Sequence, residues 1–326
     1  MRQSAVKENR PWPVQRVQIV PSGMALFYDE GATRHTLKVQ IMKRQFLRIL
    51  VVSTAALAWG SIPTLVQAEP PTYNFSPVNQ YGIQLTAAYW NPIIAYVSEK
   101  SGVKLNLKIG RTSADTTSYV LAKEVEFVFS NHLFSPEREQ LGWKVFGRRQ
   151  TPALQGQIVV PADSPITDLT QLKGKEVAFS GPEAFVVYKV PFAYLLAKKI
   201  DVKVVFAGNQ DASFAQLFSG KVLASGANSQ LLEGYAKREN KKFRVLWSSE
   251  MFQDLALMAS AKVPEKEVSA VANAFIQMAK DPKGREILHQ ASKEVGLPDD
   301  AYFIAASGAD YAAYRRFFQS APASLH

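Results

Sequence analysis

The chain has 326 residues and a formal net charge of +10 at pH 7. Nine of its 38 basic residues but only three of its 28 acidic residues precede residue 69, which leaves a net charge of +4 for residues 69–326, too mild an excess to indicate nucleic-acid binding. The chain has no cysteine, which excludes disulfides, thiolate metal sites and a cysteine nucleophile. No charge-free apolar run of about 20 residues follows residue 70, so we expect no membrane span there.

The first 68 residues contain the pattern of an export signal. A basic stretch begins at Met42, an apolar run of about a dozen residues spans 49–60, and Val66-Gln67-Ala68 resembles a signal-peptidase site. We therefore predict a signal peptide at residues 42–68, cleaved after Ala68. The alternative is a retained membrane anchor, but the apolar run is short for one. Because a signal peptide stands at the start of a protein, we expect translation to begin at Met42 and residues 1–41 to be an unstructured upstream extension.

From residue 80 onward, segments of helical periodicity alternate with short β-type runs. The pattern predicts helices at 88–100, 113–123, 184–198, 211–219, 228–238, 264–280, 283–293 and 309–319, a short helix after Asp168, and strands at 103–109, 125–129, 157–160, 175–179, 202–206, 221–224 and 243–247. Such alternation predicts an α/β fold in which helices cover the sheets. Ligands of these folds bind beyond the carboxyl ends of strands, so the loops after Phe129, Phe179, Phe206 and Ala224 are the candidate site.

One block of sequence resembles a known family. It consists of the strand 157–160, the turn Asp163-Ser164-Pro165-Ile166 and the segment ending in the strand 175–179. This block resembles the start of the second lobe in type II periplasmic solute-binding proteins, closest to the phosphate/phosphonate-type family and related to the alkanesulfonate-type receptors of ABC importers. Residues 204–222 and 281–285 agree with the same family, so the similarity spans about residues 80–295.

The resemblance implies a two-lobed α/β fold with a ligand cleft between the lobes. Lobe 1 would comprise residues 69–158 and 248–326, and lobe 2 residues 159–247. The protein would be the periplasmic substrate-binding component of an ABC importer, which closes on a small solute and presents it to a permease in the inner membrane. The same body could instead serve as a sensor that presents its closed form to a membrane histidine kinase.

Phosphonate binders of the resembled family hold the anion with a hydroxyl-rich turn after the strand that corresponds to 177–179, together with N–H groups at the start of the next helix. This chain has Ser180-Gly181-Pro182-Glu183-Ala184-Phe185 there. Ser180 keeps a hydroxyl, but the rest of the turn departs from the pattern. Glu183 would repel an oxyanion, or it caps the helix and points to water.

Polar and aromatic side chains near the other strand ends complete the candidate site. Ser130, Asn131 and His132 follow the strand at 125–129 and can donate or accept hydrogen bonds, although they could also serve only their own turn. The amides after the later strands are equally suited to helix capping. The full set of candidate ligand-binding residues is Tyr89, Ser130, Asn131, His132, Ser180, Phe185, Tyr188, Asn209, Gln210 and Asn228.

The sequence has no nucleophile elbow, zinc-protease motif, phosphate-binding loop or dinucleotide fingerprint. We therefore expect no enzyme activity, no cofactor and no bound metal. The expected partners are a small-molecule ligand and an ABC permease, with no nucleic acid, and we expect a monomer. The ligand would be a phosphonate- or phosphate-like oxyanion or a related small organic solute.

Overall fold

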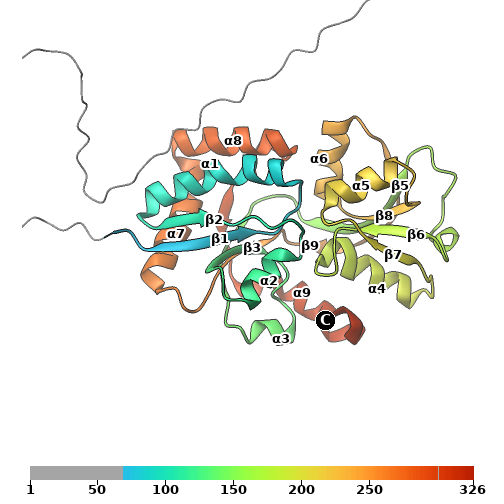
Figure 1. Ribbon diagram of the computed structural model, residues 1–326, viewed down its shortest axis with the longest axis horizontal. Helices are drawn as coiled ribbons and strands as arrows, with labels where there is room; N and C mark the ends of the chain where they lie inside the picture. The colour runs from blue at the N-terminus through green and yellow to red at the C-terminus, as the bar shows by residue number, and fades with distance from the viewer. Residues whose placement is uncertain (1–68, 300) are drawn as a thin grey trace, which may run out of the picture. The chain divides into compact units, whose positions relative to one another are not determined.

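The structure, a computed structural model, describes residues 69–299 and 301–326 (Figure 1). The predicted signal peptide at 42–68 and the predicted extension at 1–41 lie outside these residues. Within the described part of the chain, no helix combines the length and the apolar character that a membrane span requires.

The first lobe is built on a six-stranded mixed sheet. Its strands are β1 (Thr72–Pro77), β2 (Lys104–Leu107), β3 (Phe127–Ser130), β4 (Lys144–Arg149), β10 (Ala256–Ala259) and β11 (Phe303–Ala305). Their spatial order is β11-β4-β10-β3-β1-β2. β1 pairs in parallel with β2 and β3, whereas β10 runs antiparallel to both β3 and β4.

Helices cover both faces of this sheet. Helices α1 (Ile83–Ser101), α7 (Glu265–Gln277) and α8 (Pro282–Val295) pack on one face, where α1 and α8 lie side by side (Figure 1). Helices α2 (Asp115–Leu121) and α9 (Ala312–Ser320) pack on the other face, and the short α3 (Pro136–Glu139) precedes β4. The alternation of β3 follows from this arrangement, because Phe127 and Phe129 enter one core while Val128 enters the other.

The second lobe is built on a five-stranded sheet. Its strands are β5 (Leu154–Pro161), β6 (Glu176–Phe179), β7 (Lys203–Phe206), β8 (Ala224–Asn228) and β9 (Phe243–Phe252), in the order β7-β6-β8-β5-β9. A π-helical turn (Phe185–Lys189) leads into α4 (Val190–Ala197), which covers one face; α5 (Gln210–Phe218) and α6 (Ser229–Glu239) cover the other. A 3₁₀ turn (Leu169–Leu172) starts at Asp168, which forms the predicted cap.

The chain passes between the two sheets twice. It leaves the first sheet at the end of β4 and enters the second at Leu154, and it returns between Phe252 and the start of β10. The first sheet is therefore assembled from both ends of the described chain, and the second from a continuous central stretch. The crossing expected near Val159 falls inside β5, because the antiparallel pairing of β5 with β9 extends back to Leu154.

One strand lies later than predicted. The sequence predicted a strand at 221–224, but β8 comprises Ala224–Asn228, which has small side chains and no β-branched residue. The strand forms because it is fully buried beneath the π-helical turn. A Cβ at Gly226 would overlap the carbonyl oxygen of Val187 and lie 2.5 Å from the Phe179 ring, so close backbone packing decides this strand rather than β-propensity.

Candidate ligand-binding cleft

A polar cavity lies between the two lobes. Its apolar walls include Phe185, Leu231 and Leu255. Its polar lining residues are Asn79, Gln80, Ser113 and Asn131 with His132 from lobe 1, and Ser180, Gln210 and Asn228 from lobe 2. Among the described residues that line the cavity there is no Asp, Glu, Lys or Arg. The cavity therefore offers hydrogen bonds rather than a counter-charge.

The lobes are closed against each other around this cavity. Its volume is about 30 Å³, roughly the share of one water molecule in the liquid. Three hydrogen bonds join the lobes nearby: Ser113 N–H donates to the Gly208 carbonyl (2.7 Å), Gln210 N–H to the Gln80 carbonyl (3.3 Å) and Arg238 Nη1 to the Val295 carbonyl (2.8 Å). An oxyanion is larger than this volume, so the side chains and turns that line the cavity must adjust around it when the lobes close on it.

The lobe 2 wall of the cavity has hydrogen-bond donors that have no acceptor among the described residues. Ser180 is buried, and its Oγ has no hydrogen-bond partner among the described residues. The backbone N–H groups of Phe185, Val186 and Val187 also have no acceptor among these residues, because they form the first turn of the helix that continues into α4. All four residues line the cavity. Unpaired N–H groups and the positive end of the helix dipole together favour an anion at this wall.

The lobe 1 wall includes a serine that faces this turn. Ser113 is buried, and its Oγ has no partner among the described residues. A Cβ at Gly181 would lie 2.8 Å from this Oγ, so a larger residue at 181 would push the Ser113 hydroxyl out of its position. The hydroxyls of Ser113 and Ser180 thus border the cavity from opposite lobes.

His132 and Asn131 are held by lobe 1. Nδ1 of His132 lies 3.0 Å from the Thr117 hydroxyl, and its backbone N–H donates to Ser130 Oγ (3.1 Å). Burial lowers the pKa of His132 to about 3, so the imidazole is neutral at physiological pH. Nδ2 of Asn131 donates to the Tyr314 hydroxyl (3.3 Å). These side chains are positioned to bind a ligand without adding charge.

Glu183 does not point to water, which was one of the two expectations from the sequence, and its charge is paired. Its carboxylate forms a bidentate ion pair with Arg138 of lobe 1, in which Nη2 lies 2.7 Å from Oε1, and Lys189 Nζ lies 3.9 Å from Oε2. Burial raises the pKa of Glu183, but the hydrogen bond and charge of Arg138 outweigh it and hold that pKa below its ordinary value. Lys189 Nζ also donates to an oxygen of His326 (3.2 Å), so all three charged groups at this edge of the cavity are engaged by the protein.

Six of the ten predicted site residues line the cavity: Asn131, His132, Ser180, Phe185, Gln210 and Asn228. Gln210 and Asn228 also have local roles. Gln210 Nε2 donates to the Gly226 carbonyl (3.0 Å) and its Oε1 accepts from the Asn228 N–H (3.2 Å), while Asn228 Oδ1 caps α6. Lobe 2 therefore holds both amides in fixed orientations.

The other four predicted residues lie outside the lining. Asn209 caps α5 by accepting from the Ala212 N–H, and Ser130 stabilises its own turn. Tyr188 packs in an aromatic cluster of lobe 2, and the ring of Tyr89 faces the buried guanidinium of Arg149 at 5.6 Å. At Asn209 and Ser130 the structure shows the local roles that the sequence also allowed. Tyr188 and Tyr89 have packing roles instead.

Three lining residues were absent from the predicted set: Asn79, Gln80 and Ser113. Asn79 and Gln80 follow β1, which the sequence did not predict. The run Tyr73-Asn74-Phe75-Ser76 alternates as a strand does, and that signal could have led to the polar residues after it. Gln80 also accepts a hydrogen bond from Arg149 Nη2 (3.3 Å), and Arg149 is paired with Asp254 (2.8 Å) beside the two crossing segments.

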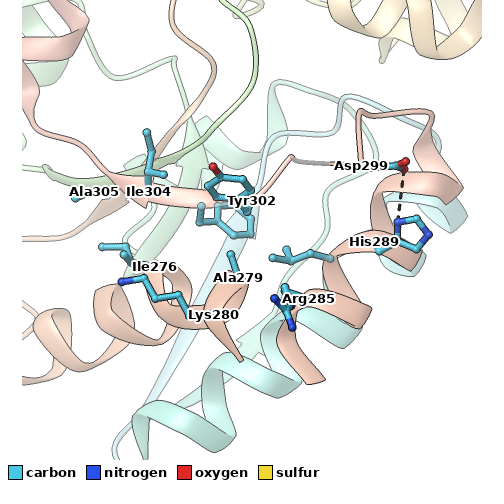
Figure 2. A pocket seen from close by; sticks show the side chains of 11 residues that line it. Ile276, Ala279, Lys280, Arg285, His289, Asp299, Tyr302, Ile304 and Ala305 are labelled. Carbon is cyan, nitrogen blue, oxygen red and sulfur yellow. Dashed lines mark ion pairs between the residues drawn. The ribbon is translucent and has the colours of Figure 1, made fainter. Parts of the chain in front are cut away.

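A larger pocket, about 750 Å³, lies on lobe 1 away from the cleft (Figure 2). It is formed by α7, α8 and the segment around β11, with an apolar floor, the cations Lys280 and Arg285, and a His289–Asp299 pair at 3.5 Å. No buried polar atom without a partner occurs among its described lining residues, in contrast to the small cavity. The cavity between the lobes is therefore the candidate ligand site.

Two α/β lobes joined by two crossing segments, with a polar cavity between them, define a two-lobed solute-binding protein. The family model for the periplasmic substrate-binding protein of phosphonate ABC transporters matches residues 75–311, and the chain belongs to that family. The resemblance drawn from the sequence and the predicted two-lobed α/β fold are confirmed. The sensor alternative gains no support from the comparisons.

Relatives of known structure or function agree with this family. The phosphonates-binding periplasmic protein of Escherichia coli K12 is 23% identical over 264 residues, which cover 74% of this chain and 78% of the relative. A binding protein of an ABC phosphonate transporter from Pseudomonas aeruginosa superposes with a TM-score of 0.66 at 15% identity, covering 77% of this chain and 87% of the other. PhnD1 from Prochlorococcus marinus, solved with methylphosphonate, gives 0.64 at 16% identity, covering 77% and 98%.

Proposed function

We propose that this protein binds a small phosphonate- or phosphate-like oxyanion between its lobes and delivers it to the membrane permease of an ABC importer. The observation that carries the proposal is the lobe 2 wall of the cavity. There the Ser180 hydroxyl adjoins three N–H groups at the start of a helix, and none of these four groups has a hydrogen-bond partner among the described residues. Such a set of donors matches the oxygens of a tetrahedral anion.

The relatives support the same class of ligand. The Escherichia coli protein is named for phosphonates, and PhnD1 was solved with methylphosphonate. In this chain the hydroxyl-rich turn is reduced to Ser180. Ser113 of lobe 1 supplies a second hydroxyl from across the cleft.

Closure of the lobes would be the signal that the permease reads. A ligand that contacts both walls binds the closed arrangement more tightly than the open one, and it shifts the population by that difference. The role is binding rather than catalysis. Export by the signal peptide predicted at 42–68 fits a periplasmic family, and we propose that the lobes meet at the crossings after β4 and after β9.

A thermal-shift screen tests the proposal. The purified protein would be melted with methylphosphonate, phosphite, phosphate, sulfate and neutral amino acids, because a ligand that binds the native state raises Tm by mass action. A concentration-dependent rise with phosphorus oxyanions is expected. A rise only with neutral or cationic organic solutes would show that the family's fold is kept for another class of ligand.

A further inference from the structure

Asn79, a residue that lines the cavity, has an acceptor that a fully ionised oxyanion cannot satisfy. Asn79 lies after β1, is 1% exposed and lines the cavity. Its Nδ2 donates to the Gly110 carbonyl, whereas its Oδ1 is buried and has no partner among the described residues. A buried acceptor without a donor costs free energy, so this atom requires a group that the protein does not provide.

The orientation of the Asn79 amide is fixed by its own hydrogen bond. Exchanging Oδ1 and Nδ2 would place two carbonyl oxygens against each other, at Asn79 and Gly110. The atom left over is therefore an oxygen that can only accept. A fully ionised oxyanion also has only acceptors and would repel it, whereas an oxyanion that keeps one proton can donate to it.

We propose that Asn79 selects the singly protonated form of the oxyanion by accepting a hydrogen bond from its P–OH group. The inference rests on the proposed function and specifies the ionic form of its ligand. A hydroxyl of the ligand fits the Asn79 acceptor better than an ammonium group would. None of the described residues that line the cavity has a carboxylate to balance an ammonium charge. The carboxylates next in sequence to lining residues are engaged by arginines, Glu183 by Arg138, Asp254 by Arg149 and Asp211 by Arg238.

Ionisable groups of the protein lie near the site. Any pH dependence that they cause must be distinguished from the titration of the ligand itself. On the Asn79 side these are Asp115, whose carboxylate accepts from the Arg111 and Thr112 N–H groups next to Gly110, and the Arg149–Asp254 pair. Lobe 1 also holds His132, which is neutral. Across the cavity, Glu183 is paired with Arg138 of lobe 1 and lies near Lys189, and Asp211 is paired with Arg238. A titration of any of these groups would have the same midpoint for every ligand.

The test compares ligands by calorimetry across pH. Methylphosphonate and phosphite differ in their second pKa, and methanesulfonate has the shape of methylphosphonate but no ionisable hydroxyl near neutral pH. For each phosphorus ligand we expect the affinity to fall about tenfold per pH unit above its own second pKa. We expect methanesulfonate to bind about tenfold to a hundredfold more weakly than protonated methylphosphonate, because Oδ1 then stays unpaired.

Two variants identify the residue. Asn79→Leu removes the acceptor, so the gap between methylphosphonate and methanesulfonate should narrow and the pH dependence should flatten. The comparison of methylphosphonate with methanesulfonate in the wild-type protein keeps the proposal testable even if the leucine variant does not fold. Asn106→Ala, an exposed change on β2, is the matched control and should leave binding as in the wild type.

The outcomes of these experiments distinguish the role of Asn79 from the proposed binding of an oxyanion. Equal binding of methanesulfonate, or a common pH midpoint for both phosphorus ligands, would overturn the role of Asn79 while leaving oxyanion binding intact. Binding of no oxyanion at any pH would instead refute the proposed function itself.

Discussion

The ion pair between Arg138 and Glu183 connects the two lobes, and its removal should open them. Arg138 lies in α3 of lobe 1, Glu183 lies in the turn after β6 of lobe 2, and their side chains are 17% and 19% exposed. Breaking a fully buried pair costs about 3–5 kcal/mol, and an exposed pair contributes about 0–1 kcal/mol. For a pair of this intermediate burial we expect a stabilisation of about 2 kcal/mol. It applies only to the closed arrangement, because the pair connects the two lobes.

That value sets the expected loss of ligand affinity. If the closed state is destabilised by about 2 kcal/mol, oxyanion affinity falls by up to about 30-fold in both Arg138→Ala and Glu183→Ala. The two variants should not add, because either one breaks the same contact, so a double-mutant cycle should give a coupling energy of about 2 kcal/mol. Isothermal titration calorimetry gives the affinities, and small-angle X-ray scattering reports the opening.

The direction of the change in affinity in Glu183→Ala distinguishes the ion pair from a simple effect of charge. A simple electrostatic effect predicts that Glu183→Ala tightens binding, because a negative charge near the anion is removed. Tighter binding in Glu183→Ala, or a coupling energy near zero, would show that the ion pair does not hold the lobes closed. The exposed pair of Arg316 and Glu250, 62% and 61% exposed and 3.9 Å apart, is the control and should show almost no coupling.

Three further predictions concern stability. Gly226→Ala should destabilise the protein by about 3 kcal/mol, since its Cβ would overlap the Val187 carbonyl; an unchanged melting temperature would contradict the tight packing. Asp254→Ala leaves the buried Arg149 guanidinium without its counter-ion and should cost about 3–5 kcal/mol in urea denaturation, and a loss below about 1 kcal/mol would argue against the buried pair. Because the pKa of Glu183 is depressed, its contribution to stability is present above its unfolded pKa, about 4.3, and is lost as the pH falls through its folded pKa; the acid unfolding of Glu183→Gln should lack this component.

Much of the second lobe could be predicted from the sequence. The strands at 175–179 and 202–206 and the helix that starts at Asn209 follow local signals, namely apolar β-type runs and a capping side chain, and the structure has them within a few residues. The first lobe was less accessible. β4, β10 and β11 were not predicted, because their short strands are paired antiparallel with segments far away in sequence, and those partners rather than local patterns determine them.

The candidate site also divides into residues that the sequence predicted and residues that it did not predict. Asn131, His132 and Ser180 were found because each follows a predicted strand at its carboxyl end. Asn79 and Ser113 could not be found in this way, since β1 was not recognised and Ser113 reaches the cavity only through the approach of Gly181 from the other lobe. The partner of Glu183 was equally hidden, because Arg138 is 45 residues away and in the other lobe.

A crystal structure with the oxyanion that gives the largest thermal shift would test the central claim most directly. We expect the ligand between the lobes, with its oxygens accepting hydrogen bonds from Ser180 Oγ and from the N–H groups of Phe185, Val186 and Val187. A ligand bound elsewhere, for example in the 750 Å³ pocket beside α8, with the cavity between the lobes unoccupied, would contradict it.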